Sequence, residues 1–362
     1  MSSPIKIRAV HTRPVVAPLR APLTTASGAL TEAPLLLIDV QTDQGIVGRA
    51  YLVAYQRFAL KPLDALVRSL AEALVGEALV PADIEKKLRA RFTLLGGTRG
   101  LAGIAISGLD MAVWDALACS RNVPLAVLLG GSCRPIRAYN SLGMIAAAQA
   151  PAEAAKALES GFKAIKIKIG WPTLAEDVAA IRAFRKAIPD DVALMADFNQ
   201  SLGVAEAIRR GQALDGEELT WLEEPVRCDD FAGCAKVAAA LRTPVQIGEN
   251  FSGPFDMEAA LAAGASDYVM PDPQQIGGVS GWLRAAALAQ AAGKDCSSHI
   301  FVEISAHLLP VTPTCHYLEY LDLASGVLAE PAKVVAGAVA APERPGIGIA
   351  WDEAAVKRYG LS

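Results

Sequence analysis

The most constraining feature of the sequence is a regular alternation of strand-like and helix-like segments between Arg137 and Asp322. Short apolar runs such as "AIKIKIG" and "VALMADFNQ" alternate with amphipathic stretches such as "LAEDVAAIRAFRKAI". Strands that alternate with helices of roughly 10 to 15 residues indicate parallel βαβ units. Because about eight such units fit into this segment, we expect a closed (β/α) barrel rather than an open sheet.

The segments on either side of the barrel follow other patterns. The first 60 residues or so read as antiparallel strands, with Asp43-Gln44-Gly45 as the turn between two apolar runs, and a helical periodicity follows up to residue 127. From residue 325 the chain is spaced by proline and glycine. We therefore predict an α+β capping domain over 1–127, a barrel domain over 128–324, and a C-terminal segment over 325–362 that packs on the cap.

Composition excludes several classes of function. The 362 residues carry a formal net charge of −4, which provides no basic surface for nucleic acid or an anionic membrane. The apolar run Pro34–Ile38 is far too short to span a bilayer, and the six cysteines are scattered without the spacing of a zinc site. The sequence therefore predicts a cytoplasmic protein that acts on a small molecule.

Polar residues stand near the C-terminal end of the predicted barrel strands. In chain order they are Ser141, Lys166 with Lys168, Asp197 with Asn199, Glu223, Glu249, Asp272, His299 and Glu319. From Lys168 onward each strand's residue follows the previous one by 20 to 29 positions, the length of one strand, one helix and two loops. Catalytic residues of such barrels gather at this end of the strands. We therefore predict an active site built from these side chains.

Three of these residues, Asp197, Glu223 and Glu249, are carboxylates on successive strands. Brought together, they repel one another and resist ionisation unless a cation lies among them. Ligand sets made of oxygen atoms suit Mg²⁺, with Mn²⁺ as a substitute. The sequence thus predicts a divalent metal site, the alternative being three unrelated acids at strand ends.

The lysine pair and the histidine supply candidate bases. Side chains alternate along a strand, so Lys166 and Lys168 share the face opposite the isoleucines of "AIKIKIG". A neighbouring cation lowers a lysine pKa toward neutrality, which suits a general base. On the far side of the barrel His299 can pair with Asp272. Two bases on one carbon indicate 1,1-proton transfer, with the metal stabilising the enediolate and Glu319, its pKa raised by the pocket, donating a hydrogen bond to it.

With these residues in view, the chain resembles the enolase superfamily and, within it, the mandelate racemase subgroup. The likeness runs along essentially the whole chain and includes the stretches "FKAIKIKIG", "ADFNQSLGV", "TWLEEP", "PVQIGEN" and "SSHIFVEISAHLL". It implies a modified (β/α)7β barrel of the TIM type with an N-terminal α+β capping domain. It also implies a homo-oligomer.

The resemblance further implies a role for each residue of the predicted site. Lys168 is the base for one enantiomer, and His299 with Asp272 is the base for the other. The remaining roles are metal ligand for Asp197, Glu223 and Glu249, electrophilic acid for Glu319, contact with the substrate carboxylate for Lys166 and Ser141, and contact with the substrate hydroxyl for Asn199. Tyr55 is retained as a pocket residue.

The residues around this machinery decide which substrate we expect. The chain departs from the subgroup's pattern at Val53, Leu142, Ile167 and Gln275. The apolar residues expected in the pocket are Leu23, Ala29, Leu30, Leu142 and Leu321. Such a lining suits an apolar substituent, which predicts a Mg²⁺-dependent racemase of mandelate or a related aryl or alkyl 2-hydroxy acid.

Other enolate chemistry, such as cycloisomerisation or amino-acid epimerisation, stays open at this point, and two further alternatives are more specific. An acid-sugar dehydratase of the same superfamily uses the same metal and bases but expels a β-hydroxyl. It needs several polar pocket residues, because each buried hydroxyl left unpaired costs roughly 1–3 kcal/mol. A non-catalytic barrel is the other alternative, but it is expected to have lost a base or a metal ligand, and each of them is present in this sequence.

Overall fold

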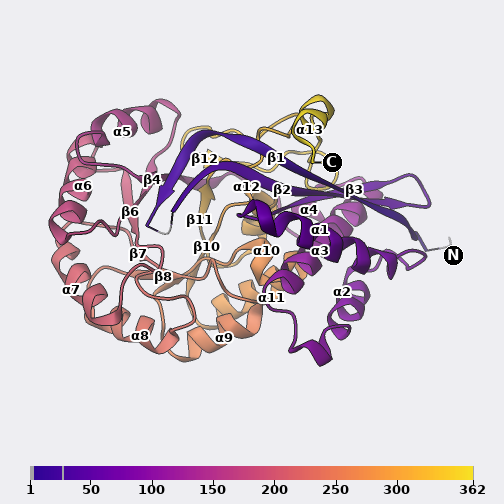
Figure 1. Cartoon of the computed structure of the whole chain (residues 1–362), viewed down its shortest axis with the longest axis horizontal. Helices are drawn as coiled ribbons and strands as arrows, with labels where there is room; N and C mark the ends of the chain where they lie inside the picture. The colour runs from indigo at the N-terminus through magenta and orange to yellow at the C-terminus, as the bar shows by residue number, and fades with distance from the viewer. Residues whose placement is uncertain (1–3, 27, 362) are drawn as a thin grey trace.

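A ring of parallel strands forms the larger part of the molecule (Figure 1). The computed structural model describes residues 4–26 and 28–361. Within these residues eight parallel strands follow one another in chain order, and the last pairs with the first to close the barrel. The strands are β4 (Ile136–Met144), β5 (Ala164–Lys168), β6 (Ala193–Asp197), β7 (Leu222–Glu223), β8 (Val245–Ile247), β9 (Tyr268–Val269), β10 (Asp295–Ser298) and β11 (Cys315–Tyr320). The predicted barrel is confirmed.

Helices connect these strands on the outside of the ring (Figure 1). They are α5 (Ala150–Glu159), α6 (Leu174–Ala187), α7 (Val204–Leu214), α8 (Phe231–Ala240), α9 (Pro254–Ala262), α10 (Pro273–Ile276) with α11 (Gly278–Ala291), and α12 (Val302–Leu308). A short 3₁₀ turn, Leu309–Val311, follows α12. Because no described helix follows β11 inside the ring, the arrangement is the (β/α)7β variant that the resemblance implied.

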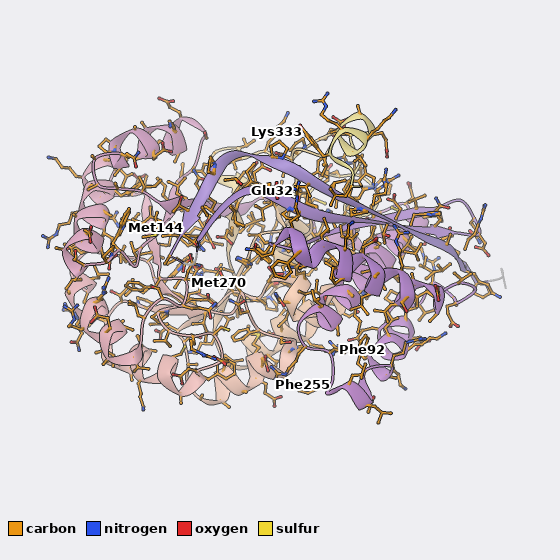
Figure 2. The ribbon with its side chains drawn as sticks, in the orientation of Figure 1. Glu32, Phe92, Met144, Phe255, Met270 and Lys333 are labelled. Atoms are coloured by element: carbon orange, nitrogen blue, oxygen red, sulfur yellow. The ribbon has the colours of Figure 1, made fainter. Side chains whose placement is uncertain are left out.

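The cap precedes the barrel and leans across its mouth (Figure 1). It contains the antiparallel strands β1 (Ile7–Thr25), β2 (Gly28–Thr42) and β3 (Val47–Val53), the helices α1 (Arg57–Glu72), α2 (Pro81–Ala90), α3 (Leu101–Ser120) and α4 (Leu125–Leu128), and a 3₁₀ turn, Thr93–Leu95. Strand β1 ends at Thr25 and β2 begins at Gly28, so Leu23, Ala29 and Leu30 lie at the far end of the β1–β2 hairpin. Met144, at the end of β4, lies beside this end of the hairpin (Figure 2).

Helix α3 forms the centre of the cap. Among the described helices it is the one long and apolar enough to span a bilayer, yet 72% of its apolar window is buried inside the protein. It packs against β3 so closely that a Cβ on Gly48 would lie 2.1 Å from the carbonyl oxygen of Ala112. This burial is typical of a core helix in a globular domain.

The C-terminal segment returns to the cap. Gly360 forms a β-bridge with Val15, and Arg13 pairs with Glu353 at 2.6 Å, within α13 (Glu353–Tyr359). A short strand that the sequence did not predict, β12 (Ala338–Val339), adds to β4 in antiparallel orientation. The exact domain boundaries at residues 127 and 324 stay a prediction.

Strand β5 has the two-faced character expected of "AIKIKIG". Ile165 and Ile167 point outward and pack with Ile181 and Phe184 of α6. Lys166 and Lys168 point into the barrel, where both are buried. Beneath them a layer of side chains fills the barrel, made of Tyr139, Ala164, Met195, Trp221 and Tyr317. The lysines therefore lie just above a packed floor at the mouth of the ring.

Asp115 of α3 joins the cap to the C-terminal segment. Its carboxylate accepts the backbone N–H of Arg49 at 2.6 Å and the backbone N–H of Ile347. Burial raises the pKa of Asp115 from 3.8 to about 7, although these two hydrogen bonds oppose the rise. The stability that this group contributes is therefore present at acidic pH and is lost as the pH rises toward 7.

We expect Asp115→Asn, which cannot ionise, to flatten this part of the pH profile. Because both Asp115 oxygens accept a backbone N–H, the variant keeps only one of the two acceptors and should also be less stable at every pH. Between pH 5 and pH 8 the wild-type protein should lose roughly 2–3 kcal/mol of unfolding free energy that the variant keeps. Urea unfolding of both proteins at the two pH values measures the difference. Parallel pH profiles for the two proteins would contradict the assignment.

Candidate active site

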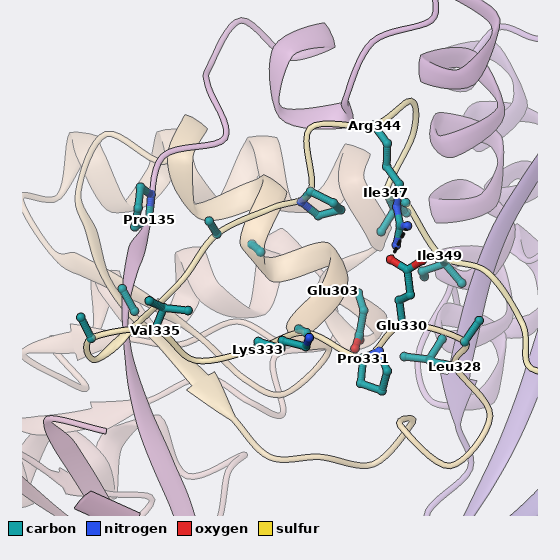
Figure 3. Close-up of a pocket in the computed structure, with 18 residues that line it drawn as sticks. Pro135, Glu303, Leu328, Glu330, Pro331, Lys333, Val335, Arg344, Ile347 and Ile349 are labelled. Carbon is teal, nitrogen blue, oxygen red and sulfur yellow. Dashed lines mark hydrogen bonds and ion pairs between the residues drawn. The ribbon is translucent and has the colours of Figure 1, made fainter. Parts of the chain in front are cut away.

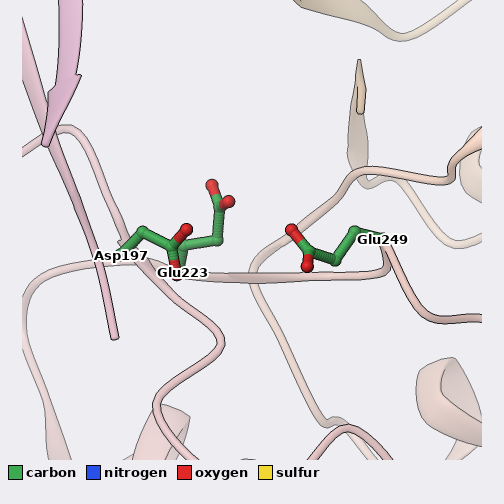
Figure 4. A group of neighbouring side chains, drawn as sticks. All are labelled: Asp197, Glu223 and Glu249. Carbon is green, nitrogen blue, oxygen red and sulfur yellow. The ribbon is translucent and has the colours of Figure 1, made fainter. Parts of the chain in front are cut away.

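Three carboxylates meet at the C-terminal ends of β6, β7 and β8. Asp197 ends β6, Glu223 ends β7, and Glu249 follows β8 by two residues. One carboxylate oxygen from each lies within 4.8 Å of the others, and the three groups point toward a common centre (Figure 4). Asp197 and Glu223 are fully buried, whereas Glu249 is partly exposed. The predicted metal ligands are thus adjacent in space.

Glu223 accepts hydrogen bonds from side chains of the barrel interior. Lys166 donates a hydrogen bond to one of its oxygens, and the other accepts from Trp221 Nε1 at 2.8 Å and from Gln246 Nε2 at 3.3 Å. Burial raises the pKa of Glu223 to about 8, against the attraction of Lys166. Sequence analysis did not single out Trp221 or Gln246, although Trp221 stands two residues before Glu223 and so shares its face of the strand.

Each lysine is paired with a carboxylate. Lys168 Nζ lies 2.6 Å from Asp197 Oδ2, and Lys166 Nζ contacts both Glu223 and Glu319, the latter at 2.7 Å. Burial lowers the pKa of both lysines, but the carboxylates outweigh it and the pKa values are raised. The lowering of the Lys168 pKa, expected with a metal beside the lysine pair, stays a prediction. The charge of Lys166 lowers the pKa of Lys168, but the charge of Asp197 raises that pKa more strongly.

His299 lies at the end of β10 and pairs with Asp272, which follows β9. Its Nδ1 is 2.7 Å from Asp272 Oδ2, and its Nε2 is directed at the carboxylates of Glu249 (3.3 Å) and Glu319 (3.7 Å). The backbone N–H of Gln274 donates to the other Asp272 oxygen at 2.6 Å. Burial lowers the pKa of His299, but these carboxylates outweigh it and raise the pKa to about 10.

Glu319 on β11 is nearly inaccessible to solvent. It accepts hydrogen bonds from Lys166 and, at 3.0 Å, from the backbone N–H of Ile300. Burial raises its pKa, but the charges of Lys166 and His299 outweigh burial and hold the pKa well below the usual range. The raised pKa expected for Glu319 is therefore not found, because two cations face it.

The backbone around these side chains is strained. Six of the described non-glycine residues with positive φ lie here, with values from 36° at Ile300 to 63° at Gln200; the others of the six are Tyr55, Asn199, Glu224 and Phe301. L-residues adopt this region at a cost, and such residues gather at sites where geometry serves a function. The mouth of the barrel thus has the character of a functional site on backbone evidence alone.

A cavity of about 350 Å³ opens between these side chains and the cap. Of the predicted site residues, Lys168, Glu249, His299, Glu319, Asn199, Tyr55 and Leu321 line it. Leu23, Ala29 and Leu30 line it from the hairpin end of the cap, as expected. Asp197, Glu223, Asp272, Lys166 and Ser141 lie buried behind this wall, so Lys166 serves here as a counter-charge and not as a cavity residue.

Three residues expected to shape the cavity do not line it. Ile167 and Leu142 lie on the outward faces of their strands, where they contact the apolar cluster under α6. Val53 is buried at the end of β3 and meets the barrel through its backbone. Instead, polar side chains that the sequence did not suggest contribute to the wall, namely Gln56, Gln200 and Asn250, together with Gln275.

A larger cavity of about 960 Å³ lies elsewhere, between α12 and the C-terminal segment. Leu328, Val335 and Ile349 line it, and an ion pair between Glu330 and Arg344 (2.7 Å) spans its edge (Figure 3). None of the described residues of the predicted site contributes to it. We therefore assign the chemistry to the smaller cavity at the barrel mouth.

The carboxylate cluster fits a hard divalent cation. The donors are oxygen atoms from three side chains that lie within 4.8 Å of one another, the kind of set that Mg²⁺ prefers. Glu249 borders the cavity, so a metal held by the cluster has access to a ligand there. Asp197, Glu223 and Glu249 are the residues that would hold it.

Comparison with known families agrees with this geometry. Residues 7–130 match the mandelate racemase/muconate lactonizing enzyme N-terminal domain, and residues 149–355 match the enolase C-terminal domain-like family. The chain belongs to the enolase superfamily, in its mandelate racemase subgroup. It is therefore a Mg²⁺-dependent enzyme of that superfamily, and the sequence-based recognition is confirmed.

Individual relatives carry out different reactions. A crystal structure of an enolase from Bradyrhizobium, complexed with magnesium and mandelic acid, has a TM-score of 0.97 and 48% identity, covering 100% of both chains. L-talarate/galactarate dehydratase of Salmonella typhimurium is 31% identical over 92% of this chain and 84% of its own length. A 3,6-anhydro-alpha-L-galactonate cycloisomerase of Streptomyces coelicolor is 32% identical over 92% and 94%. Racemases also occur among the relatives.

Proposed function

We propose that the protein is a Mg²⁺-dependent racemase of a 2-hydroxy acid with an aryl or alkyl side chain, such as mandelate, and that it acts by 1,1-proton transfer. The observation that carries the proposal is the presence of two different bases, Lys168 and His299, in the wall of one cavity beside the carboxylate cluster. The mandelic acid bound by the Bradyrhizobium relative supports the choice of substrate.

In this proposal each base serves one face of the substrate. A bound Mg²⁺ supplies positive charge that stabilises the substrate carboxylate as its α-proton leaves. Lys168 removes or returns the proton on one face. His299 does so at Nε2 on the other face, since Asp272 occupies its Nδ1. The two bases lie on β5 and β10, three strands apart one way round the ring and five the other way, within the described barrel.

The other side chains bind and orient the substrate. Lys166 Nζ donates a hydrogen bond to Glu319 Oε1 at 2.7 Å. Glu319 lines the cavity, where negative charge would develop on the substrate. We assign Ser141 and Asn199 to the substrate carboxylate and hydroxyl, respectively, and Lys166, which lies buried behind the cavity wall, to the carboxylate from behind Glu319. Ser141 is buried, and its Oγ has no partner among the described residues, so a donor is available there. Tyr55 and Leu321 would contact the substituent.

Circular dichroism of a single enantiomer of mandelate tests the proposed function. The signal should decay to zero with Mg²⁺ present, should persist after EDTA treatment, and should decay again when Mg²⁺ or Mn²⁺ is restored. A panel of aryl and alkyl 2-hydroxy acids extends the test to related substrates. A signal that persists for every member of the panel, with metal present, contradicts the proposal.

A second candidate is an acid-sugar dehydratase. The polar cavity residues Gln200, Asn250 and Gln275 favour it, because they could bind sugar hydroxyls, and so does the Salmonella relative. The apolar lining from Leu23, Ala29, Leu30 and Leu321 favours the racemase instead. Galactarate-type substrates would lose water to form 2-keto acids, which semicarbazide detects.

The homo-oligomer and the cytoplasmic location stay predictions. Light scattering of the purified protein measures the oligomeric state.

The hairpin end of the cap should tune substrate affinity. A Cβ on Gly143 would lie 2.8 Å from the carbonyl oxygen of Thr24 and 2.9 Å from its nitrogen. Because backbone atoms cannot yield as a side chain can, Gly143→Ala should push the hairpin away from the cavity that Leu23 and Thr25 line. We expect KM to rise roughly tenfold, or about 1.4 kcal/mol, with a smaller change in kcat.

Gly203→Ala is the matched control for this change. A Cβ there would meet no atom within 4 Å, and Gly203 has an ordinary extended conformation, with φ −84° and ψ 159°. Steady-state kinetics of both variants measures the difference. Equal KM values for Gly143→Ala and the wild type would show that substrate affinity does not depend on the close contact between the hairpin and Gly143.

A further inference from the structure

Gln274 connects the cap to the barrel through a two-point contact. Its side chain is fully buried, and both ends of its amide bind one backbone residue of the cap. Oε1 accepts the N–H of Val53 at 3.0 Å, and Nε2 donates to the carbonyl oxygen of Val53 at 3.2 Å. This is the contact that a neighbouring strand would make, and β3 is an edge strand of the cap sheet, so Gln274 completes its hydrogen bonding.

The barrel side of Gln274 reaches the histidine dyad. Its backbone N–H donates to Asp272 Oδ1 at 2.6 Å, while Asp272 Oδ2 lies 2.7 Å from His299 Nδ1. One residue therefore contacts both the end of β3 and the carboxylate that orients the histidine. The contact joins positions 221 residues apart in the sequence.

Tyr55 stands two residues beyond the clamped position and lines the cavity. Its backbone adopts φ 55°, a conformation that is costly for tyrosine unless its surroundings hold it in place. The carbonyl oxygen of Pro34 holds the intervening Ala54 N–H at 2.9 Å, so β2 fixes one side of this short stretch and Gln274 fixes the other. Both residues that precede Tyr55 are thus held by hydrogen bonds, Val53 by Gln274 and Ala54 by Pro34.

We propose that Gln274 is a positioning residue that sets the distance between Tyr55 on the cap and the His299–Asp272 dyad on the barrel. The effect of Gln274 on turnover rests on the proposed function. The clamp, by which we mean the two hydrogen bonds between the Gln274 amide and the Val53 backbone, does not. Loss of the amide releases Val53 and lets Tyr55 move. It leaves in place the backbone N–H of residue 274, which donates a hydrogen bond to Asp272. Substrate affinity should therefore suffer more than the chemical step.

Gln274→Met tests the proposal, because methionine keeps the length and most of the volume of glutamine and removes both amide hydrogen bonds. Hydrogen–deuterium exchange, resolved to single amides by mass spectrometry, reports on Val53. We expect Val53 to be protected in the wild-type protein, although it belongs to an edge strand, and to exchange at least about tenfold faster in the variant. KM should rise about tenfold, with kcat within about threefold of the wild type.

Gln290→Met on the exposed face of α11 is the matched control and should change neither quantity. Should Gln274→Met fold poorly, Gln274→Asn provides a second variant, since its amide is one methylene too short to reach both atoms of Val53. Unchanged exchange at Val53 in the folded variant would overturn the clamp. Faster exchange with an unchanged KM would overturn the positioning role. A wild-type protein without racemase activity would refute the proposed function and leave the exchange result to decide the clamp.

Discussion

Replacing Glu249 with glutamine should weaken Mg²⁺ binding by at least about 100-fold and remove most of the turnover, because a ligand that carries full negative charge becomes neutral. Within the described residues Glu249 has no lysine partner, whereas Asp197 pairs with Lys168 and Glu223 pairs with Lys166. Glu249 is also the ligand that borders the cavity. His299 Nε2 lies 3.3 Å from Glu249, so Glu249 has a histidine as its partner in place of a lysine, and it is the ligand that a metal entering from the cavity meets first.

Isothermal titration of the metal-free protein with Mg²⁺ and Mn²⁺ measures this loss without reference to activity. Glu258→Gln on the exposed surface of α9 is the matched control, since it makes the same chemical change away from the cluster. An unchanged dissociation constant for Glu249→Gln would show that the cluster is not the metal site. Full turnover in a rigorously metal-free preparation would contradict the requirement for a metal.

His299→Asn and Lys168→Met should each abolish racemisation, with a loss on the order of 10²–10⁴-fold, because either direction needs both bases. Each variant should nevertheless still exchange the α-proton of one enantiomer with solvent deuterium. His299→Asn retains the exchange that Lys168 performs, and Lys168→Met retains the exchange that His299 performs. The asparagine cannot take up a proton at neutral pH, and the methionine cannot at any pH.

Two surface substitutions provide the controls for this pair. His11→Asn and Lys61→Met make the same chemical changes at exposed positions and should leave both half-reactions intact. Proton NMR of each enantiomer in D₂O follows the exchange. If His299→Asn lost exchange of both enantiomers equally, the arrangement of one base on each face would be refuted.

The sequence was sufficient to predict the ring and its functional edge. The regular spacing of polar residues from Lys168 to Glu319 predicted that they occupy equivalent positions at the ends of successive strands. The structure brings those residues to one end of the barrel. Alternation along β5 likewise predicted that Lys166 and Lys168 would point inward. Both inferences depend on local periodicity and chain length, which the sequence carries directly.

The prediction of the cavity lining was wrong at the residues where it ignored the alternation of side chains along a strand. The pattern that turns Lys166 and Lys168 inward turns Ile167 outward, so a change at Ile167 cannot reach the cavity. Leu142 stands next to Ser141, whose side chain is buried with the inner face of β4, and it points outward for the same reason. Applied consistently, the strand period would have removed both residues from the predicted pocket.

Other features depend on contacts between distant parts of the chain. The pKa values of Lys168 and Glu319 are set by which opposite charges lie within a few ångströms, and strand alternation alone does not give those distances. The contact of Gln274 with Val53 joins two domains and has no local signal, because an amide beside a proline is unremarkable in the sequence. The backbone strain at Tyr55 and Ile300 is similarly a product of the assembled structure.

Incubation of the wild-type enzyme with Mg²⁺ in D₂O, followed by NMR, tests the proposed racemisation most directly. Enantiopure mandelate and a panel of 2-hydroxy acids and acid sugars serve as substrates. We predict that an aryl or alkyl 2-hydroxy acid forms its mirror image with deuterium at the α-carbon, and that no 2-keto acid appears. Loss of water from an acid sugar to a 2-keto-3-deoxy acid, without α-deuteration of any simple 2-hydroxy acid, would contradict racemisation and establish the dehydratase instead.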